Sequence, residues 1–196
     1  QAYYDQDPWR GTWSMDGGVL TNQASHHVDM LEWMMGDVES VFAKITTALA
    51  NVETEDTAIV TLKFKNGALG IIEATTATRP TNLEGSISIL GENGTVVVGG
   101  VAVNEMQTWV FEDEQEGDSN VLEEFSVNPP NVYGFGHQAY YEHVVDCIKS
   151  GSANLVDGLQ GRKSIELISA IYESAETGKE VFLKFQSKHC RLGQKS

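Results

Sequence analysis

The sequence predicts an α+β domain, with a mainly antiparallel, open-faced sheet and helices packed on one face. Apolar and polar residues alternate through the middle of the chain, and turn signals separate the runs. Three amphipathic segments flank these runs. The chain lacks the strand–helix–strand alternation and the Gly-x-Gly-x-x-Gly motif of a dinucleotide-binding fold. Hairpin-linked strands therefore form an antiparallel sheet, and the helices cover it.

Composition and charge narrow the classes of partner. The chain has 196 residues, 41% of them hydrophobic, and a net charge of −15, which argues against nucleic acid and anionic membranes as partners. No apolar run approaches the roughly 20 residues that cross a bilayer. Cys147 and Cys190 form no disulfide framework, and the opening Gln1-Ala2-Tyr3 does not resemble a signal peptide. We expect a cytoplasmic protein.

The opening loop, residues 3–13, is dense in aromatic and charged side chains and is punctuated by Pro8 and Gly11. Exposed rings of the kind that Trp9 provides stack on a sugar or a base, and Arg10 can hold an anion. The alternative is that these rings cover an edge of the core. Both interpretations stay open at this stage.

A glycine turn and a helix follow the loop. Gly17-Gly18 allows a tight turn, Asp16 is the expected N-cap, and Gly36 is the expected end of the helix. Two faces are expected on this helix, a polar one suited to the wall of a reaction cleft and an apolar one facing the core. The polar face holds Asn22, His26, Asp29 and Trp33, and the apolar face holds Leu20, Ala24, Val28, Leu31 and Met35. A polar face that is merely solvated is the alternative.

The middle of the chain is expected to form strands. Asn66-Gly67 is a strong hairpin signal, and the acidic run 112–118 is expected to be a solvated hairpin tip, since it lacks the ligand spacing of a calcium loop. Ile59 and the pair Ile71-Ile72 indicate that neither sheet face is wholly polar, which favours self-association. The expected strands are 38–49, 56–65, 68–78, 84–90, 95–98, 101–103, 108–112, 121–127 and 181–185.

Two more helices close the domain. The first, 136–150, ends at Gly151, and the second is capped by Asp157 and ends at Gly178. Residues 186–196 are expected to be a polar tail. The apolar faces of these helices are expected to hold Tyr140, Val144, Cys147 and Ile148, then Ile165, Ile168, Ile171, Tyr172 and Ala175.

The motif Gly17-Gly18, Asn22, His26, Asp29 resembles the start of the carboxy-terminal domain of the Gfo/Idh/MocA oxidoreductases. Ala24 stands where this family usually has Gly, and Asn22 where many members have Asp. The strand segment 55–68 and the helix segment 161–178 also resemble the family. The resemblance covers nearly the whole chain, so we expect one domain over residues 1–185.

The resemblance implies a nicotinamide-dependent sugar oxidoreductase. In the family a Rossmann domain binds NAD or NADP and supplies a lysine that works with the histidine, and neither feature is present in this sequence. Members assemble through the open sheet face, which implies a homo-oligomer. When the roles of the family's residues are carried over to matching positions, the resemblance implies that His26 is the catalytic histidine and that Asn22 is its neighbour in the active site. It places Trp9, Arg10, Thr12, Asp29 and His137 near the substrate.

The opening segment, with Asn22-Gln23, is similar to family members that oxidise UDP-linked N-acetylglucosaminuronic acid (UDP-GlcNAcA) at the 3-hydroxyl, a step of surface-polysaccharide biosynthesis. One alternative is a non-catalytic module that binds a sugar nucleotide or self-associates. A metal hydrolase using His26, His27 and Asp29 is a weaker alternative, because adjacent helical residues point about 100° apart. The sequence thus favours no metal site.

Overall fold

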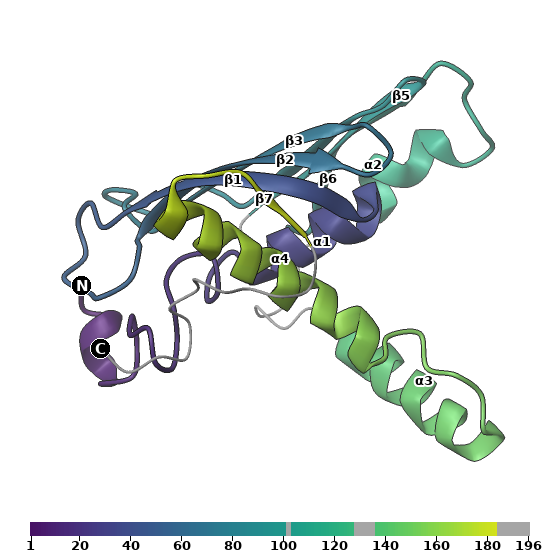
Figure 1. Cartoon of the computed structure of the whole chain (residues 1–196). Helices are drawn as coiled ribbons and strands as arrows, with labels where there is room; N and C mark the ends of the chain where they lie inside the picture. Colours follow the sequence, from purple (N-terminus) through teal and green to yellow (C-terminus); the bar gives the residue numbers. More distant parts are fainter. Residues whose placement is uncertain (101–102, 128–135, 184–196) are drawn as a thin grey trace. The chain divides into compact units, whose positions relative to one another are not determined.

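The computed structural model describes residues 1–100, 103–127 and 136–183, and they form two compact units (Figure 1). The first unit comprises Gln1–Asn82 and the described residues from Gly158 onward. The second comprises the described residues of Leu83–Asp157. The helices and strands of the first unit are η1 (Tyr4–Gln6), α1 (Ser25–Met35), β1 (Val38–Thr46), β2 (Thr57–Phe64), β3 (Leu69–Thr75), α4 (Gly158–Thr177) and β7 (Val181–Phe182). Those of the second unit are β4 (Ile87–Leu90), β5 (Gly94–Gly99), β6 (Glu105–Phe111), η2 (Asp118–Asn120), α2 (Val121–Glu124) and α3 (Gly136–Ser150).

The first unit is an antiparallel sheet in the order β3-β2-β1-β7, with α1 and α4 on one face (Figure 1). Alternate residues of β2, beginning with Ala58, point into the core, and the intervening ones, such as Ile59, are exposed. This confirms the α+β class and the open sheet face. The core is made by side chains from β1, β2, β3, α1, α4 and the segment before α1, and its largest fully buried members are Tyr172, Phe64, Leu20, Leu167 and Ile171.

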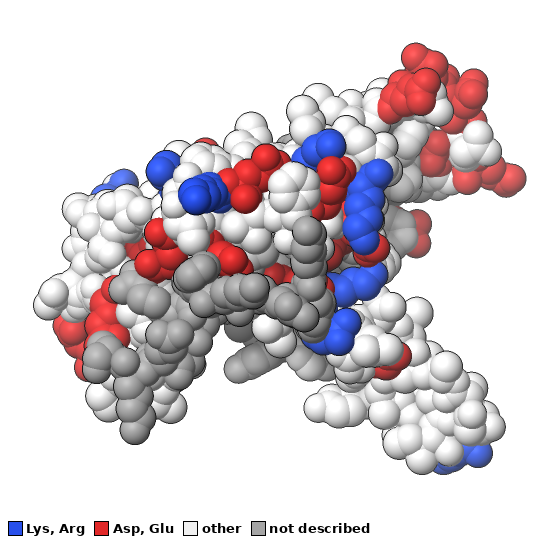
Figure 2. Space-filling view, in the orientation of Figure 1, with Lys and Arg blue, Asp and Glu red and all other residues white. Residues whose placement is uncertain are grey.

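The second unit contains a separate antiparallel sheet in the order β4-β5-β6, so the strands form two sheets where the sequence suggested one. Residues 121–124 of the expected strand 121–127 form helix α2 instead. The acidic run leads from β6 into η2 and α2 rather than into a hairpin, and Figure 2 shows acidic side chains gathered there. Its side chains are almost all exposed, as a solvated segment requires.

Most other expected elements are present with shifted ends. The hairpin at Asn66-Gly67 joins β2 to β3, and Gly67 has a positive φ of 93°. Gly36, Gly151 and Gly178 end α1, α3 and α4 as predicted, each with a positive φ. Ile165 is exposed rather than part of the buried face of α4. Part of the expected strand 101–103, the end of strand 181–185, the 1–185 boundary and the tail lie outside the described residues.

The start of α1 differs from the prediction. The helix begins at Ser25, and residues 12–24 form a series of turns, so Asp16 is not its N-cap. The backbone N–H groups of Val19 and Leu20 donate to Glu55 and not to the side chain of Asp16. Asn22 therefore precedes the helix, and only His26, Asp29 and Trp33 share an exposed face of α1. In a survey of the described residues, no helix combines the length and apolar character that a membrane span needs.

Candidate functional site

The Gly17-Gly18 turn is held against the residues that precede β2. A Cβ added to Gly18 would collide with the backbone carbonyl and the carboxylate of Glu55, so only glycine fits there. The N–H of Val19 donates to the Glu55 carbonyl at 3.0 Å. The Thr54 hydroxyl lies 3.1 Å from the carbonyl of Gly17. The glycine motif is thus explained by a close approach to a buried carboxyl group.

That carboxyl group forms a small buried network with α4. Glu55 Oε1 accepts from the N–H of Leu20 at 3.0 Å and from the hydroxyl of Tyr172 at 2.8 Å. Tyr172 Oη accepts from the N–H of Gly18 at 3.3 Å. Burial raises the pKa of Glu55, and the two donors to Oε1 oppose it. The pKa of Tyr172 is raised mainly by burial and further by the charge of the nearby Glu55. Sequence reasoning placed Tyr172 in the core but missed this network.

Asn22 lies in a second, more exposed network. Its Oδ1 accepts from the hydroxyl of Tyr3 at 3.2 Å, and its Nδ2 donates to Asp16 Oδ1 at 2.6 Å. The other oxygen of Asp16 accepts from the N–H of Gly11 at 2.8 Å. Asp16, expected to cap a helix, therefore joins Asn22 to the opening loop. The amide of Asn22 is oriented by fixed partners before any ligand binds.

His26 and Asp29 lie one turn apart on α1, and both are exposed. The neighbouring His27 is half-buried, and burial lowers its pKa. Neither ring nitrogen of His27 has a hydrogen-bond partner among the residues that the structure describes. The two adjacent histidines therefore differ: His26 is accessible to a ligand, whereas the ring of His27 is partly packed against the protein.

Glu32, on the same helix, is a titratable group that sequence reasoning missed. Its side chain is 7% exposed, and Oε2 has no partner within the described part of the chain. Burial raises its pKa to about 7, and the nearby Asp37 adds to this while Lys163 opposes it. An i, i+4 count from Val28, which is fully buried, could have placed Glu32 on the core side of α1.

The opening loop folds around Arg10. Its guanidinium pairs with Asp7 at 3.0 Å, donates to the Tyr3 carbonyl at 3.1 Å and lies over the ring of Tyr3 at 4.2 Å. The Trp9 ring lies 5.3 Å away from it, and the Thr12 hydroxyl donates to the Trp9 carbonyl at 2.7 Å. Much of the hydrogen-bonding capacity of Arg10 is satisfied inside the loop. Trp9 is 39% exposed, so its ring remains available for stacking.

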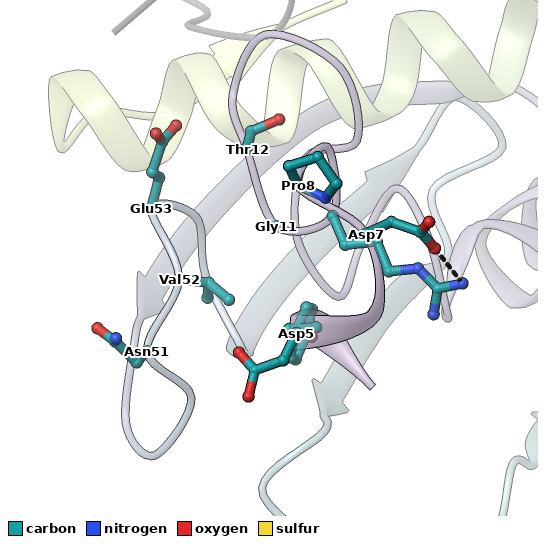
Figure 3. Close-up of a pocket in the computed structure, with 10 residues that line it drawn as sticks. Asp5, Asp7, Pro8, Gly11, Thr12, Asn51, Val52 and Glu53 are labelled. Atoms are coloured by element: carbon teal, nitrogen blue, oxygen red, sulfur yellow. Dashed lines mark ion pairs between the residues drawn. The ribbon is translucent and has the colours of Figure 1, made fainter. Parts of the chain in front are cut away.

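A pocket of about 380 Å³ lies between the opening loop and the β1–β2 connection (Figure 3). Arg10 and Thr12 line it, whereas Trp9, Asn22 and His26 do not. Asn51 and Glu53, which line its other side, were not predicted; the polar run 53–56 before β2 was the available signal. The full lining is Tyr4, Asp5, Asp7, Pro8, Arg10, Gly11, Thr12, Asn51, Val52 and Glu53.

Asp56 holds the β1–β2 connection in place. Its carboxylate is buried and accepts from the backbone N–H groups of Ala48, Leu49 and Ala50, each at 2.7 Å. Burial raises the pKa of Asp56, but these three donors outweigh it and hold the pKa below its usual value. Asp56 thus helps to hold the connection that forms one side of the pocket.

His137 is the second residue of α3, in the second unit, and is exposed. The structure links Asn22 by hydrogen bonds to the opening loop, which contains Arg10 and Thr12, and it places His26 and Asp29 on the adjoining helix α1. His137 belongs to the other unit. Across residues 1–100, 103–127 and 136–183, no group of three His, Cys, Asp or Glu side chains is arranged to hold a metal ion.

Comparison with known proteins gives a consistent result. Residues 1–183 match the family described as "Oxidoreductase family, C-terminal alpha/beta domain", of the Gfo/Idh/MocA type. The WlbA dehydrogenase from Bordetella pertussis, solved with NADH and UDP-GlcNAcA, is 45% identical with a TM-score of 0.87, covering 94% of this chain and 53% of that one. WlbA from Chromobacterium violaceum, solved with the same ligands, is 47% identical with a TM-score of 0.85, and the match covers 95% of this chain and 52% of that one.

A curated relative, the myo-inositol 2-dehydrogenase of Thermotoga maritima, is 28% identical over 177 residues, or 87% of this chain and 50% of that protein. The chain therefore spans about half the length of the proteins it matches. Since the family model matches residues 1–183, which include both units, the chain belongs to the Gfo/Idh/MocA oxidoreductase family and corresponds to the C-terminal α/β domain of its members.

Proposed function

We propose that this chain is the substrate-binding half of a nicotinamide-dependent dehydrogenase that oxidises an alcohol of a sugar nucleotide, with UDP-GlcNAcA as its substrate. The supporting observation is the 45–47% identity, over 94–95% of the chain, to two WlbA dehydrogenases solved with that compound. Relatives that act on free sugars or polyols are more distant, as the 28% identity to the myo-inositol enzyme illustrates.

The described residues do not form a dinucleotide-binding fold. Every strand pair among them is antiparallel, so this part of the chain contains no strand–helix–strand unit with a phosphate-binding turn. We therefore assign no cofactor-holding residue here. We propose that a second, nucleotide-binding half holds NAD or NADP, and we call the two halves together the complete enzyme. The isolated chain is expected to have negligible affinity for NAD.

In this proposal His26 accepts the proton that the alcohol loses on oxidation. Its ring is exposed on α1, as a group that meets a substrate must be. Asn22, oriented by Tyr3 and Asp16, holds a substrate hydroxyl or the imidazole in place. Asp29, one turn along the exposed face, is proposed to contact the sugar. His137 is proposed as a further substrate contact on the strength of the family resemblance alone.

We assign the opening loop and its pocket to substrate binding as well. The Trp9 ring offers a stacking surface, and Thr12, Asn51 and Glu53 offer polar groups suited to hydroxyls. Three carboxylates, those of Asp5, Asp7 and Glu53, line the pocket. A negative lining favours the neutral, hydroxyl-bearing parts of the substrate over its phosphates.

Self-association is a second proposed role, supported by the open face of the first unit. Phe42, Ile59, Leu69 and Ile71 are exposed on the side opposite the helices. Apolar area of this kind marks interfaces, and a sheet face can be shared by two copies of the chain. A cytoplasmic location and a role in surface-polysaccharide biosynthesis complete the proposal.

The test is substrate oxidation by the complete enzyme. With UDP-GlcNAcA and NAD⁺ or NADP⁺, the absorbance of the reduced nicotinamide should rise, and UDP-N-acetylglucosamine, which lacks the carboxylate, should give a far slower rate. Turnover of myo-inositol without turnover of UDP-GlcNAcA would contradict the substrate class. Tight binding of UDP-GlcNAcA without any turnover would contradict the enzyme assignment and favour a non-catalytic binding module.

A further inference from the structure

Glu55 and Tyr172 are buried polar groups that contact neither the proposed pocket nor the exposed face of α1. Glu55 is 1% exposed and Tyr172 is fully buried. Glu55 Oε2 has no hydrogen-bond partner among the described residues. A buried carboxyl group with an unsatisfied oxygen is costly, and an apolar pair of similar volume would often be as stable. Its presence therefore calls for a role other than stability.

The contacts of this pair converge on three consecutive residues. Tyr172 Oη accepts from the N–H of Gly18, the Glu55 carbonyl accepts from Val19, and Glu55 Oε1 accepts from Leu20. The Tyr172 hydroxyl also donates to Glu55 Oε1 at 2.8 Å, which fixes the two side chains relative to each other. The three backbone N–H groups of Gly18–Leu20 are thus all engaged by two residues, Tyr172 of α4 and Glu55 of the segment before β2.

Carbonyl groups of the same backbone hold the start of α1. The Gly18 carbonyl accepts from the N–H of Asn22 at 3.1 Å, and the Val19 carbonyl accepts from Ala24 at 2.8 Å. The Ala24 carbonyl in turn accepts from Val28, inside the helix, at 3.0 Å. Each hydrogen bond fixes the next, so a shift of Gly18–Leu20 is passed on to Asn22 and to the first turn of α1, where His26 lies.

We propose that Glu55 and Tyr172 are positioning residues that set the place of Asn22 and His26 through the Gly18–Leu20 backbone. The inference rests on the proposed function, in which His26 takes a proton from the substrate. Neither residue contacts the substrate in this account. Their effect is on catalysis rather than on affinity, because displacement of a reacting group by about 1 Å can cost about 10²-fold in rate.

The first variant is Tyr172→Phe in the complete enzyme, which removes one hydroxyl and keeps the ring in the core. Its control is Ser174→Ala, which removes a buried hydroxyl from the same helix. Ser174 Oγ accepts from the N–H of Ala43 in β1 and donates to the Lys179 carbonyl, so it has no contact with Gly18–Leu20. The two changes should lower the melting temperature to a similar small extent.

The kinetic constants separate positioning from stability. Tyr172→Phe should lower kcat by about 10–100-fold with little change in KM, and Ser174→Ala should leave both unchanged. The imidazole NMR signals of His26 should shift in Tyr172→Phe and stay in place in Ser174→Ala. Equal kcat values for the two variants would overturn the inference, since loss of a buried hydroxyl would then act only through stability.

Glu55→Gln tests the carboxyl group in the same way. Gln keeps an acceptor for Leu20 and Tyr172, so it should retain most of the activity, whereas Glu55→Leu, which keeps only the volume, should lose kcat as Tyr172→Phe does. His26→Ala separates the two proposals. If His26→Ala lowers kcat and Tyr172→Phe does not, positioning is wrong and the proposed function stands. If His26→Ala has no effect on kcat, the proton-accepting role of His26 and the positioning proposal are both wrong, whereas the substrate assignment stands or falls with the turnover of UDP-GlcNAcA.

Discussion

Asp56 offers a prediction whose size follows from its contacts. The substitution is Asp56→Asn, with Glu73→Gln on the open face of β3 as the charge-matched control, because Glu73 is exposed. In the folded chain one oxygen of Asp56 accepts from Ala48 and the other from both Leu49 and Ala50, each at 2.7 Å. Asn keeps one acceptor oxygen, so at least one of these bonds is lost and an amide N–H faces a backbone N–H.

Hydrogen bonds to a charged acceptor contribute about 1.5–3 kcal/mol each. With one bond lost and the others weakened by loss of the charge, the free energy of unfolding should fall by about 2–3 kcal/mol. Urea denaturation at neutral pH, followed by tryptophan fluorescence, measures this change, since Trp13 lies in the core of the first unit. Glu73→Gln should change the free energy of unfolding by less than about 0.5 kcal/mol.

The pH dependence has a defined sign. The pKa of Asp56 is lower in the folded chain than the unfolded value of about 3.9. Its stabilisation is therefore fully present above about pH 5 and is lost as the pH falls through the folded-state pKa. The difference between the wild-type chain and Asp56→Asn should be constant down to about pH 5 and shrink below about pH 4. A difference that stays constant through this range, or an Asp56→Asn as stable as Glu73→Gln, would refute the reasoning.

Two further predictions concern packing and assembly. Gly18→Ala should lower the free energy of unfolding by about 3 kcal/mol or more because the added Cβ collides with Glu55. Gly161→Ala in α4, where nothing lies within 4 Å of the added Cβ, should raise the free energy of unfolding by about 0.5–1 kcal/mol. Chemical denaturation measures both changes, and equal effects would contradict the packing argument. Ile71→Lys on the open sheet face should lower the molar mass measured by light scattering. Met15→Lys should not change it, because Met15 is about as exposed but lies outside that sheet. A wild-type chain that is strictly monomeric would contradict the proposed interface.

The local rules were sufficient where local interactions decide the structure. Asn66-Gly67 forms its hairpin, and Gly36 and Gly178 end their helices, because a positive φ is needed at a single position. The alternation in β2 placed Val60 in the core and Ile59 on the open face. In each case the residue and its immediate neighbours contain all the information that is needed.

The local rules failed where a distant residue competes for the same group. Asp16 was expected to cap a helix, but its carboxylate is engaged by Gly11 and Asn22, and Glu55 takes the N–H groups of Val19 and Leu20. Glu55 is more than thirty residues from these donors in the sequence, so no local pattern could indicate it. Because of these tertiary contacts, the helix begins at Ser25 and not directly after Asp16.

A similar effect explains the second unit. Residues 121–127 alternate enough to suggest a strand, but η2 precedes them and continues into helix α2. Asp118 holds that turn by accepting from the N–H of Gln115 at 2.7 Å and from Trp109 Nε1 at 2.8 Å. For so short a segment, periodicity alone does not separate helix from strand.

The sequence indicated candidate residues for the site, but it did not indicate how they are arranged in space. The motif led to Asn22 and His26, and the structure shows that they belong to different elements. The pocket residues Asn51 and Glu53 come from a connection that Asp56 folds back, which only the three-dimensional contacts reveal. A family resemblance transfers residue identities, whereas the hydrogen bonds that position those residues must be observed.

The most direct test of the central claim compares two adjacent histidines in the complete enzyme. His26 is exposed, whereas His27 is half-buried with a lowered pKa, and in our proposal His26 is the one that takes a proton from the substrate. The measurement is kcat for UDP-GlcNAcA oxidation by His26→Ala and His27→Ala. His26→Ala should lower kcat by about 10²–10⁴-fold, and His27→Ala should leave it nearly unchanged. Asn22→Ala should fall between them. Loss of activity in His27→Ala with full activity in His26→Ala would contradict the account.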